Sequence, residues 1–261
     1  SILGNSATCG GGIYSFSYSG TLTVINSTIS GNSATVGGGI YGNDNTLTVT
    51  NSTIAGNSAY KGGGIYSRSD TLTVINSTIA GNSAYKGGGI YSYLGTLTVI
   101  NSTIAGNSAG RGGGGIYSDY VTLTVANSTI AGNSANYGGG IYSRSDTLAV
   151  TNSILFLNTG PGGDEIWDAL TSQSGFNLIG VDPRFVRNPG PGVDGTWGTE
   201  DDDPGDLRLT PQSPAINLGS NTLLPPDTED LDGDGNTTES IPFDLDGQSR
   251  IYGGRVDIGA Y

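Results

Sequence analysis

The chain has 261 residues, 46 of them glycine, and few large apolar side chains, which favours one elongated domain with a thin core over a globular one. Residues 1–150 carry 4 acidic and 5 basic side chains and residues 151–261 carry 19 and 5, giving net charges of +1 and −14. This balance excludes a basic nucleic-acid surface, and we expect no nucleic-acid partner. The single cysteine, Cys9, excludes an internal disulfide.

A segment of about 25 residues repeats from the beginning of the chain, as the solenoid class of repeat proteins would show. The isoleucine that follows a run of glycines recurs at spacings of 27, 25, 25, 26 and 25 residues. The length varies only in the loop 16–20 and in one glycine run, whereas the segments between them keep a constant length. Insertions confined to loops are typical of a solenoid and exclude a compact two-domain enzyme.

Each repeat holds three short segments with the pattern of β-strands. Residues 71–74 (Thr-Leu-Thr-Val) alternate polar and apolar side chains, and 64–67 (Gly-Ile-Tyr-Ser) and 77–79 (Ser-Thr-Ile) supply two more strands. Three strands and three bends predict one coil of a parallel β-helix, in which each strand pairs with its counterpart about 4.8 Å away. A leucine-rich repeat would need leucines at fixed offsets, which this sequence lacks.

This coil assigns an environment to each position of the repeat. We expect four apolar side chains of one repeat to point inward and stack on their equivalents: Ile65, Leu72, Val74 and Ile79. Asn76 and Asn82 are predicted at bends, where stacked amides satisfy backbone groups outside the strand ladders. The glycines at 62–64 allow a bend that a Cβ atom would block.

Two sets of signatures resemble known bacterial surface proteins. The repeats Gly-Gly-Gly-Ile and Ile-x-Gly-Asn (residues 54–57 and 79–82) resemble those of polymorphic outer-membrane proteins, with Ile in place of Phe. The motifs at 182–185, 207–209, 213–216, 244–247 and 256–261 resemble the C-terminal part of choice-of-anchor Q proteins. The resemblance implies an all-β, right-handed parallel β-helix on an exported protein, and it implies no particular activity.

Taken in chain order, the sequence divides into three parts. Residues 1–158 hold regular β-helix repeats, 159–186 hold degenerate final coils, and 187–261 form an irregular acidic cap rich in Pro, Gly and Asp. We expect this cap to close the end of the solenoid, because a terminal coil otherwise exposes its core and its ladder edge. Ser1 aligns with the middle of a coil, which predicts either an upstream segment that is missing or processed off, or an open N-terminal edge that contacts another copy or another surface protein.

An acidic stretch in the third part has the spacing of a calcium-binding loop. Residues 230–235 follow the pattern D-x-D-x-D-G, in which alternate carboxylates converge on one hard cation. Ile241 stands where the bidentate glutamate of such a loop is expected, so a nearby acid must replace it. The predicted ligands of a structural Ca²⁺ are Asp230, Asp232, Asp234, Asn236, Glu239, Asp244 and Asp246. A weaker second cluster comprises Asp194, Glu200, Asp201, Asp202 and Asp203.

Outward strand positions form two threonine rows. Their members are Thr21, Thr23, Thr46, Thr48, Thr71, Thr73, Thr96, Thr98, Thr122 and Thr124. Stacked in register, they resemble the arrays of β-helical ice-binding proteins. The alternative interpretation is that threonine is a favourable solvent-facing strand residue.

A tyrosine follows each inward isoleucine and is therefore predicted to point outward. The row comprises Tyr14, Tyr41, Tyr66, Tyr91, Tyr117 and Tyr142. Exposed stacked aromatic rings bind sugar faces or a neighbouring protein, but they also stabilise a sheet by stacking on one another.

These patterns favour a structural protein over an enzyme. The chain has no histidine, and its acidic residues do not recur on one strand face as a pair of glycosidase carboxylates would. We therefore predict no catalytic residues and no transmembrane segment, in a non-catalytic extracellular or cell-surface solenoid that is structural or adhesive and assembles head to tail. The alternatives are a carbohydrate-binding or polysaccharide-active β-helix that uses the tyrosine row, and an ice-binding protein that uses the threonine rows.

Overall fold

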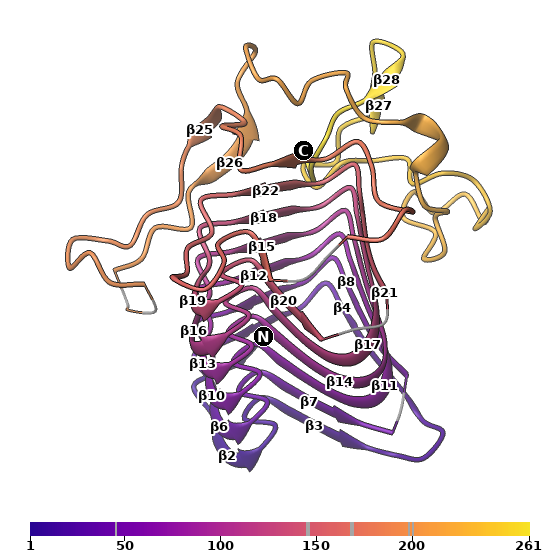
Figure 1. Ribbon diagram of the computed structural model, residues 1–261. Helices are drawn as coiled ribbons and strands as arrows, with labels where there is room; N and C mark the ends of the chain where they lie inside the picture. The colour runs from indigo at the N-terminus through magenta and orange to yellow at the C-terminus, as the bar shows by residue number, and fades with distance from the viewer. Residues whose placement is uncertain (45, 145–146, 168–169, 198, 200) are drawn as a thin grey trace.

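The chain folds into a parallel β-solenoid with an irregular C-terminal tail beside it (Figure 1). The computed structural model describes residues 1–44, 46–144, 147–167, 170–197, 199 and 201–261. Each coil contributes a strand to each of three sheets, which we name A, B and C, and all strand pairs within these sheets are parallel. In the described ranges no helix is long and apolar enough to cross a bilayer.

The three sheets run along the solenoid, and several coils contribute two strands to sheet C. Sheet A contains β1 (Ile2–Leu3), β5 (Thr28–Ser30), β9 (Thr53–Ala55), β12 (Thr78–Ala80), β15 (Thr103–Ala105), β18 (Thr129–Ala131), β22 (Ile154–Phe156) and β24 (Leu178–Ile179). Sheet B contains β2 (Ser6–Cys9), β6 (Ser33–Val36), β10 (Ser58–Lys61), β13 (Ser83–Lys86), β16 (Ser108–Gly112) and β19 (Ser134–Tyr137). Sheet C contains β3 (Ile13–Phe16), β4 (Thr21–Ile25), β7 (Ile40–Asn43), β8 (Thr46–Thr50), β11 (Ile65–Ile75), β14 (Ile90–Ile100), β17 (Ile116–Ala126), β20 (Ile141–Arg144), β21 (Thr147–Thr151) and β23 (Ile166–Trp167).

The predicted inward residues form the core. Equivalent residues of successive coils pair directly, so that Ile65 lies beside Ile90 and Leu72 beside Leu97. All four predicted side chains (Ile65, Leu72, Val74 and Ile79) are fully buried, and they belong to one continuous apolar cluster. Because the coils share a register, each apolar side chain is covered by its own equivalents above and below.

The bends also occur where the sequence places them. Asn76 has a φ of 48°, a left-handed conformation that asparagine tolerates better than most residues, and its equivalents in the other coils share it. One difference concerns two segments that were predicted as separate strands. They form the continuous strand β11, which turns at Ser69 with a φ of 56° without losing its pairing to β14.

Sheet B is a set of strands that the sequence pattern does not predict. Its segments, such as Ser-Ala-Tyr-Lys in β10, contain few β-branched residues and no regular alternation of large apolar side chains. They become strands because the neighbouring coils hold their backbones at pairing distance, with Ser58 beside Ser83 and Lys61 beside Lys86. Pairing between neighbouring coils therefore outweighs the weak intrinsic preference of these residues for a strand.

A buried ladder of asparagine side chains runs along the core beside sheet B. The Oδ1 atom of Asn107 accepts hydrogen bonds from the backbone N–H and the Nδ2 of Asn82, at 3.0 and 2.9 Å. The Nδ2 of Asn107 donates to Asn133 Oδ1 and to the carbonyl of Ile79, both at 2.9 Å. These asparagines are fully buried, so every coil depends on its neighbour to satisfy its polar groups.

The tail is irregular and contains only short elements among its described residues. These are the antiparallel pairs β25 (Phe185–Arg187) with β26 (Asp206–Leu209) and β27 (Ile251–Tyr252) with β28 (Arg255–Val256), and the 3₁₀ helix η1 (Asn221–Leu223). Its apolar residues Phe185, Leu207 and Ile258 pack against Ala105, Ala131 and Ile154 on the outward side of sheet A. Ile241 packs against Ile75, Ile100 and Ala126 at the adjoining corner.

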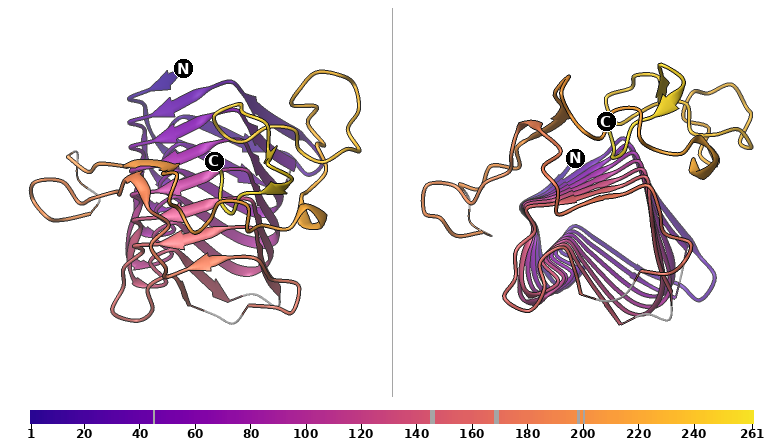
Figure 2. Two further views of the ribbon diagram at one scale, coloured as in Figure 1. Left: turned by 90° about the horizontal axis from the view of Figure 1, so that it is seen from above. Right: turned by 45° about the horizontal axis from the view of Figure 1, so that its top comes forward.

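The expectation that residues 187–261 close the end of the solenoid is therefore wrong. The tail runs back along the flank formed by sheet A (Figure 2). The physical reason is that strands of sheet A end in small side chains, such as Ala105 in β15 and Ala131 in β18. These small side chains leave a shallow apolar face on the outward side of the sheet. Burying this face removes more apolar surface from water than an end plate over one thin coil would.

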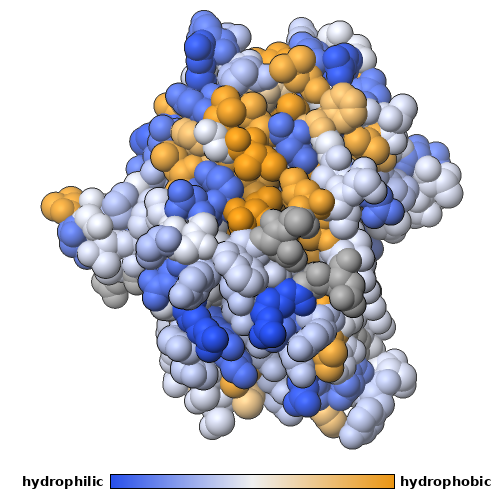
Figure 3. All heavy atoms as spheres, in the orientation of Figure 1, coloured by the Kyte–Doolittle hydropathy of each residue, from blue (hydrophilic) through white to orange (hydrophobic). Residues whose placement is uncertain are grey.

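The solenoid ends in one degenerate coil rather than in several. Ile166 and Ile179 continue the core stacks but are only partly buried. Trp167, Leu170 and Phe176 of the same coil are 40%, 37% and 51% exposed. On the face that carries this last coil, apolar side chains gather in a visible patch (Figure 3).

Candidate functional site

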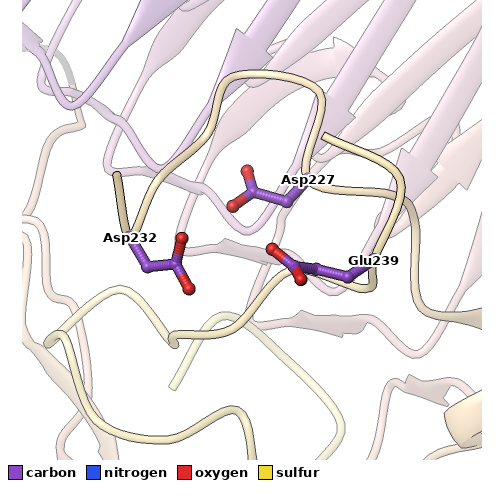
Figure 4. Close-up of side chains that lie close together, drawn as sticks. All are labelled: Asp227, Asp232 and Glu239. Atoms are coloured by element: carbon purple, nitrogen blue, oxygen red, sulfur yellow. The ribbon is translucent and has the colours of Figure 1, made fainter. Parts of the chain in front are cut away.

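An acidic loop between Asp227 and Glu239 is the one part of the tail in which carboxylates converge, among the residues that the structure describes. The loop is closed at its base, where the backbone N–H of Asp227 donates to the Glu239 carbonyl at 2.7 Å and the N–H of Ile241 donates to Pro225 at 3.1 Å. The carboxylate oxygens of Asp227, Asp232 and Glu239 lie within 4.8 Å of one another. Their side chains point toward a common centre (Figure 4).

A second group of carboxylates shares Asp232 with the first and follows the predicted motif. Ligand oxygens of Asp230, Asp232 and Asp234 also lie within 4.8 Å of one another. The Oδ1 atom of Asp230 accepts the N–H of Gly235 at 3.1 Å, which folds the loop around the acids. Asn236 orients Glu239 by donating from Nδ2 to Oε2 at 2.6 Å.

Asp227 was not predicted, because it precedes the repeating acidic motif. It is only 1% exposed, and its Oδ2 accepts the N–H of Leu231 at 2.8 Å. Burial and the neighbouring carboxylates Asp232 and Asp230 raise its pKa. The pKa of Glu239 is raised in the same way, by desolvation and by Asp234 and Asp232. The sequence offers two signals for a ligand at Asp227: the apolar Ile241 at the twelfth position of the motif, and the presence of an acid before the motif.

Asp244 and Asp246 do not join this group, so the predicted ligand set is corrected at these two positions. The Oδ1 atom of Asp244 instead accepts the backbone N–H groups of Asp246 and Gln248, at 3.0 and 2.8 Å. Asp246 lies with Tyr261 at an open groove between the tail and sheet A, which is lined also by Thr53 and Thr78.

The weaker predicted cluster does not converge on one point either. Asp201 accepts hydrogen bonds from Thr199 and from the N–H groups of Val193 and Asp194, and these lower its pKa. Asp203 forms an ion pair with Arg187 at 2.7 Å, which lowers the pKa of that carboxyl. Asp202 is half-buried, and Glu200 lies outside the described residues.

The tyrosine row stacks as one column but is not an exposed platform. Ring centroids are 4.6–5.2 Å apart from Tyr14 to Tyr142, and Trp167 extends the column at 4.5 Å. Tyr66, Tyr91 and Tyr117 are only 7%, 4% and 2% exposed, so the prediction that these rings are accessible is wrong. They point away from the core but into the corner between sheets B and C, whose side chains cover them.

Two lysines of sheet B cover part of the tyrosine column. Lys61 Nζ lies 5.7 Å from the ring centroid of Tyr91, and Lys86 Nζ lies 5.2 Å from that of Tyr117. Desolvation raises the pKa of Tyr117 to about 12. Desolvation also lowers the pKa of Lys86, and the positive charges of Arg111 and Lys61 lower it further. The column is therefore an internal stabilising element, with about 0.5–1.5 kcal/mol expected for each stacked pair.

The threonine rows form in the predicted register. Thr71 lies beside Thr96 and Thr73 beside Thr98, and the same pairing continues through the neighbouring coils. Thr71 is exposed and Thr73 is half-buried. Their possible contact with ice stays a prediction.

Glu165 terminates the buried asparagine ladder at the last coil, where its Oε2 accepts from Asn158 Nδ2. Desolvation raises the pKa of this carboxyl to about 7, against the opposing effect of the Asn158 hydrogen bonds. The folded protein binds the Glu165 proton more tightly than the unfolded chain does. The contribution of Glu165 to the free energy of unfolding is therefore greatest at acidic pH, and it falls as the pH rises from about 4.5 to 7.

Glu165→Gln should remove this pH dependence, because the amide oxygen still accepts from Asn158 and carries no charge. After allowance for solvent screening, we expect a gain of about 1–2 kcal/mol in the free energy of unfolding at pH 8 and little change at pH 4. Urea unfolding of both proteins at several pH values tests this. An equal difference at pH 4 and pH 8 would contradict the assignment of the raised pKa to Glu165.

Comparison with protein families gives one match. A family described as a right-handed β-helix region matches residues 38–199, which is more than half of the chain. The predicted fold class is thereby confirmed. A search of curated proteins found no match.

Proposed function

Because the chain belongs to the right-handed β-helix family, we propose that it is a non-catalytic structural or adhesive solenoid, exported to the cell surface, whose coil ends stack on a second copy. The observation that carries this proposal is the exposed last coil. Ile166 and Ile179 reach the end of the core stacks while the tail occupies the flank instead. An edge of a sheet with apolar side chains is a ready site for another chain.

The occupant that fits this end is another coil of the same kind. The rings of the aromatic column are spaced like the coils, and Trp167 ends the column. A second copy stacked in register would place an aromatic ring of its own column over Trp167 and continue the core, an association of the head-to-tail type.

The sequence resemblance supports the cellular location in this proposal. Polymorphic outer-membrane proteins and choice-of-anchor Q proteins are exported, and the Gly-Gly-Gly-Ile repeats and the motif at 256–261 resemble theirs. The family of right-handed β-helices includes polysaccharide lyases and hydrolases as well as proteins without activity.

Two observations favour the structural alternative over activity on sugars. The rings that would form the sugar platform, Tyr66, Tyr91 and Tyr117, are buried. Of the converging carboxylates, Asp227 is 1% exposed, so it does not reach a substrate. A glycosidase needs both carboxyl groups at the scissile bond.

Sedimentation velocity over a wide range of protein concentration tests the association. We expect the wild-type protein to form assemblies that grow with concentration, and Leu170→Asp and Ile166→Asp to remain monomeric, because each places a charge on the apolar end. Val193→Asp is the matched control, since Val193 is fully exposed in a tail loop. Wild-type protein that stays monomeric throughout, or equal loss in the control, would refute the proposal.

A further inference from the structure

Asp227 is a buried acid with an oxygen that has no partner. Its side chain is 1% exposed, and although Oδ2 accepts from Leu231, Oδ1 makes no hydrogen bond despite its burial. The Oε1 atom of Glu239, which faces the same centre, is also buried without a partner (Figure 4). Leaving a buried charged acceptor unsatisfied in this way destabilises the folded loop.

No basic side chain of the tail compensates these charges. All five of its arginines, which lie in the described part of the chain, bond elsewhere. Arg187 and Arg208 pair with Asp203 and Asp206. The others donate to backbone carbonyls: Arg184 to Gln212, Arg250 to Asp257 and Gly259, and Arg255 to Gly219. The cluster therefore lacks a counter-charge from the tail.

The geometry points to a divalent cation in that place, and we propose that Asp227, Asp232 and Glu239 bind Ca²⁺. Calcium prefers oxygen ligands at about 2.3–2.6 Å, so oxygens on opposite sides of one ion are separated by about 5 Å or less. The three carboxylates, with oxygens within 4.8 Å of one another, meet this requirement. Asp230 and Asp234, which share Asp232 with them, offer further oxygens from the adjoining turn.

Binding at this point would fix the tail to the solenoid. Leu231, which lies inside the loop, packs with Ile241 against Ile75 and Ile100 at the corner beside sheet A. Beyond the loop, the carbonyl of Phe243 accepts a hydrogen bond from Asn101 Nδ2 at 3.0 Å. A cation that draws Asp227, Asp232 and Glu239 together therefore holds the loop in the form that makes these contacts. This inference does not depend on the proposed association of coil ends.

Calorimetric titration of the calcium-free protein with CaCl₂, alone and in the presence of MgCl₂, tests the site. We expect binding to the wild type and a loss of about tenfold or more in affinity for Asp227→Asn and for Asp232→Asn. Asp182→Asn is the matched control, because Asp182 is an exposed acid outside both acidic clusters, and it should bind as the wild type does. Far-ultraviolet circular dichroism verifies that each variant is folded.

Hydrogen exchange of the segment 224–243 provides a second readout. Calcium should slow exchange there in the wild type and in Asp182→Asn, and should leave it unchanged in Asp227→Asn. Absence of calcium binding to the wild type, loss of calcium binding when magnesium is present, or undiminished affinity in Asp227→Asn would overturn the site. Binding without slower exchange would overturn its role in holding the tail.

Discussion

Replacing Gly88 by alanine is expected to reduce the free energy of unfolding by about 3 kcal/mol or more. A Cβ atom at this position would lie 2.4 Å from the carbonyl oxygen of Ser108 and 2.6 Å from that of Gly114. Both are backbone atoms of the next coil, so neither can turn aside as a flexible side chain would. The added methyl group must push two coils apart.

Gly110→Ala is the matched control for this substitution. Its Cβ would meet only the ring of Tyr85, at 3.4 Å, and the residue is exposed. We expect a change within about 0.5 kcal/mol, or a slight gain from reduced flexibility of the unfolded chain. Urea unfolding followed by circular dichroism compares the two. Similar midpoints for Gly88→Ala and Gly110→Ala would contradict the close stacking of the glycine runs.

Asn107→Ala should cost about 3 kcal/mol, because it interrupts the buried ladder at its centre. The substitution removes the acceptor of the Asn82 N–H and one of the two acceptors of Asn82 Nδ2. It also removes the side-chain donor to Asn133 Oδ1 and to the Ile79 carbonyl. All of these groups lie among fully buried asparagines, where water does not replace the lost partners.

The control for the ladder is Asn136→Ala, an exposed asparagine whose Nδ2 donates to the Gly110 carbonyl at 2.8 Å. Since water replaces that bond, we expect a loss of no more than about 0.5 kcal/mol. Thermal unfolding of both variants is the measurement. A loss for Asn107→Ala as small as that of the control would show that the ladder does not hold the coils together.

The repeated part of the fold could be predicted from the sequence because each position occurs many times in the same environment. The inward residues Ile65, Leu72 and Val74 and the bend at Asn76 follow from periodicity and local preference alone. Sheet B could not be predicted this way, because Ser-Ala-Tyr-Lys becomes a strand only through its neighbours.

The features that the sequence did not reveal depend on contacts between distant segments. Tyr91 points away from the core as expected, but its burial depends on side chains from sheet B, such as Lys61, whose position requires knowledge of how the sheets meet. The tail lies on sheet A because of small side chains such as Ala131, which carry no signal of their own. Asp227 belongs to the acidic loop only once the loop closes on Glu239.

Electron microscopy of the wild-type protein at high concentration tests most directly the claim that the stacking which builds the solenoid also joins one chain to the next. We predict rods whose lengths are multiples of one solenoid and in which the strand repeat of about 4.8 Å continues across each junction. Particles of a single length at every concentration, or rods joined along their flanks, would contradict it.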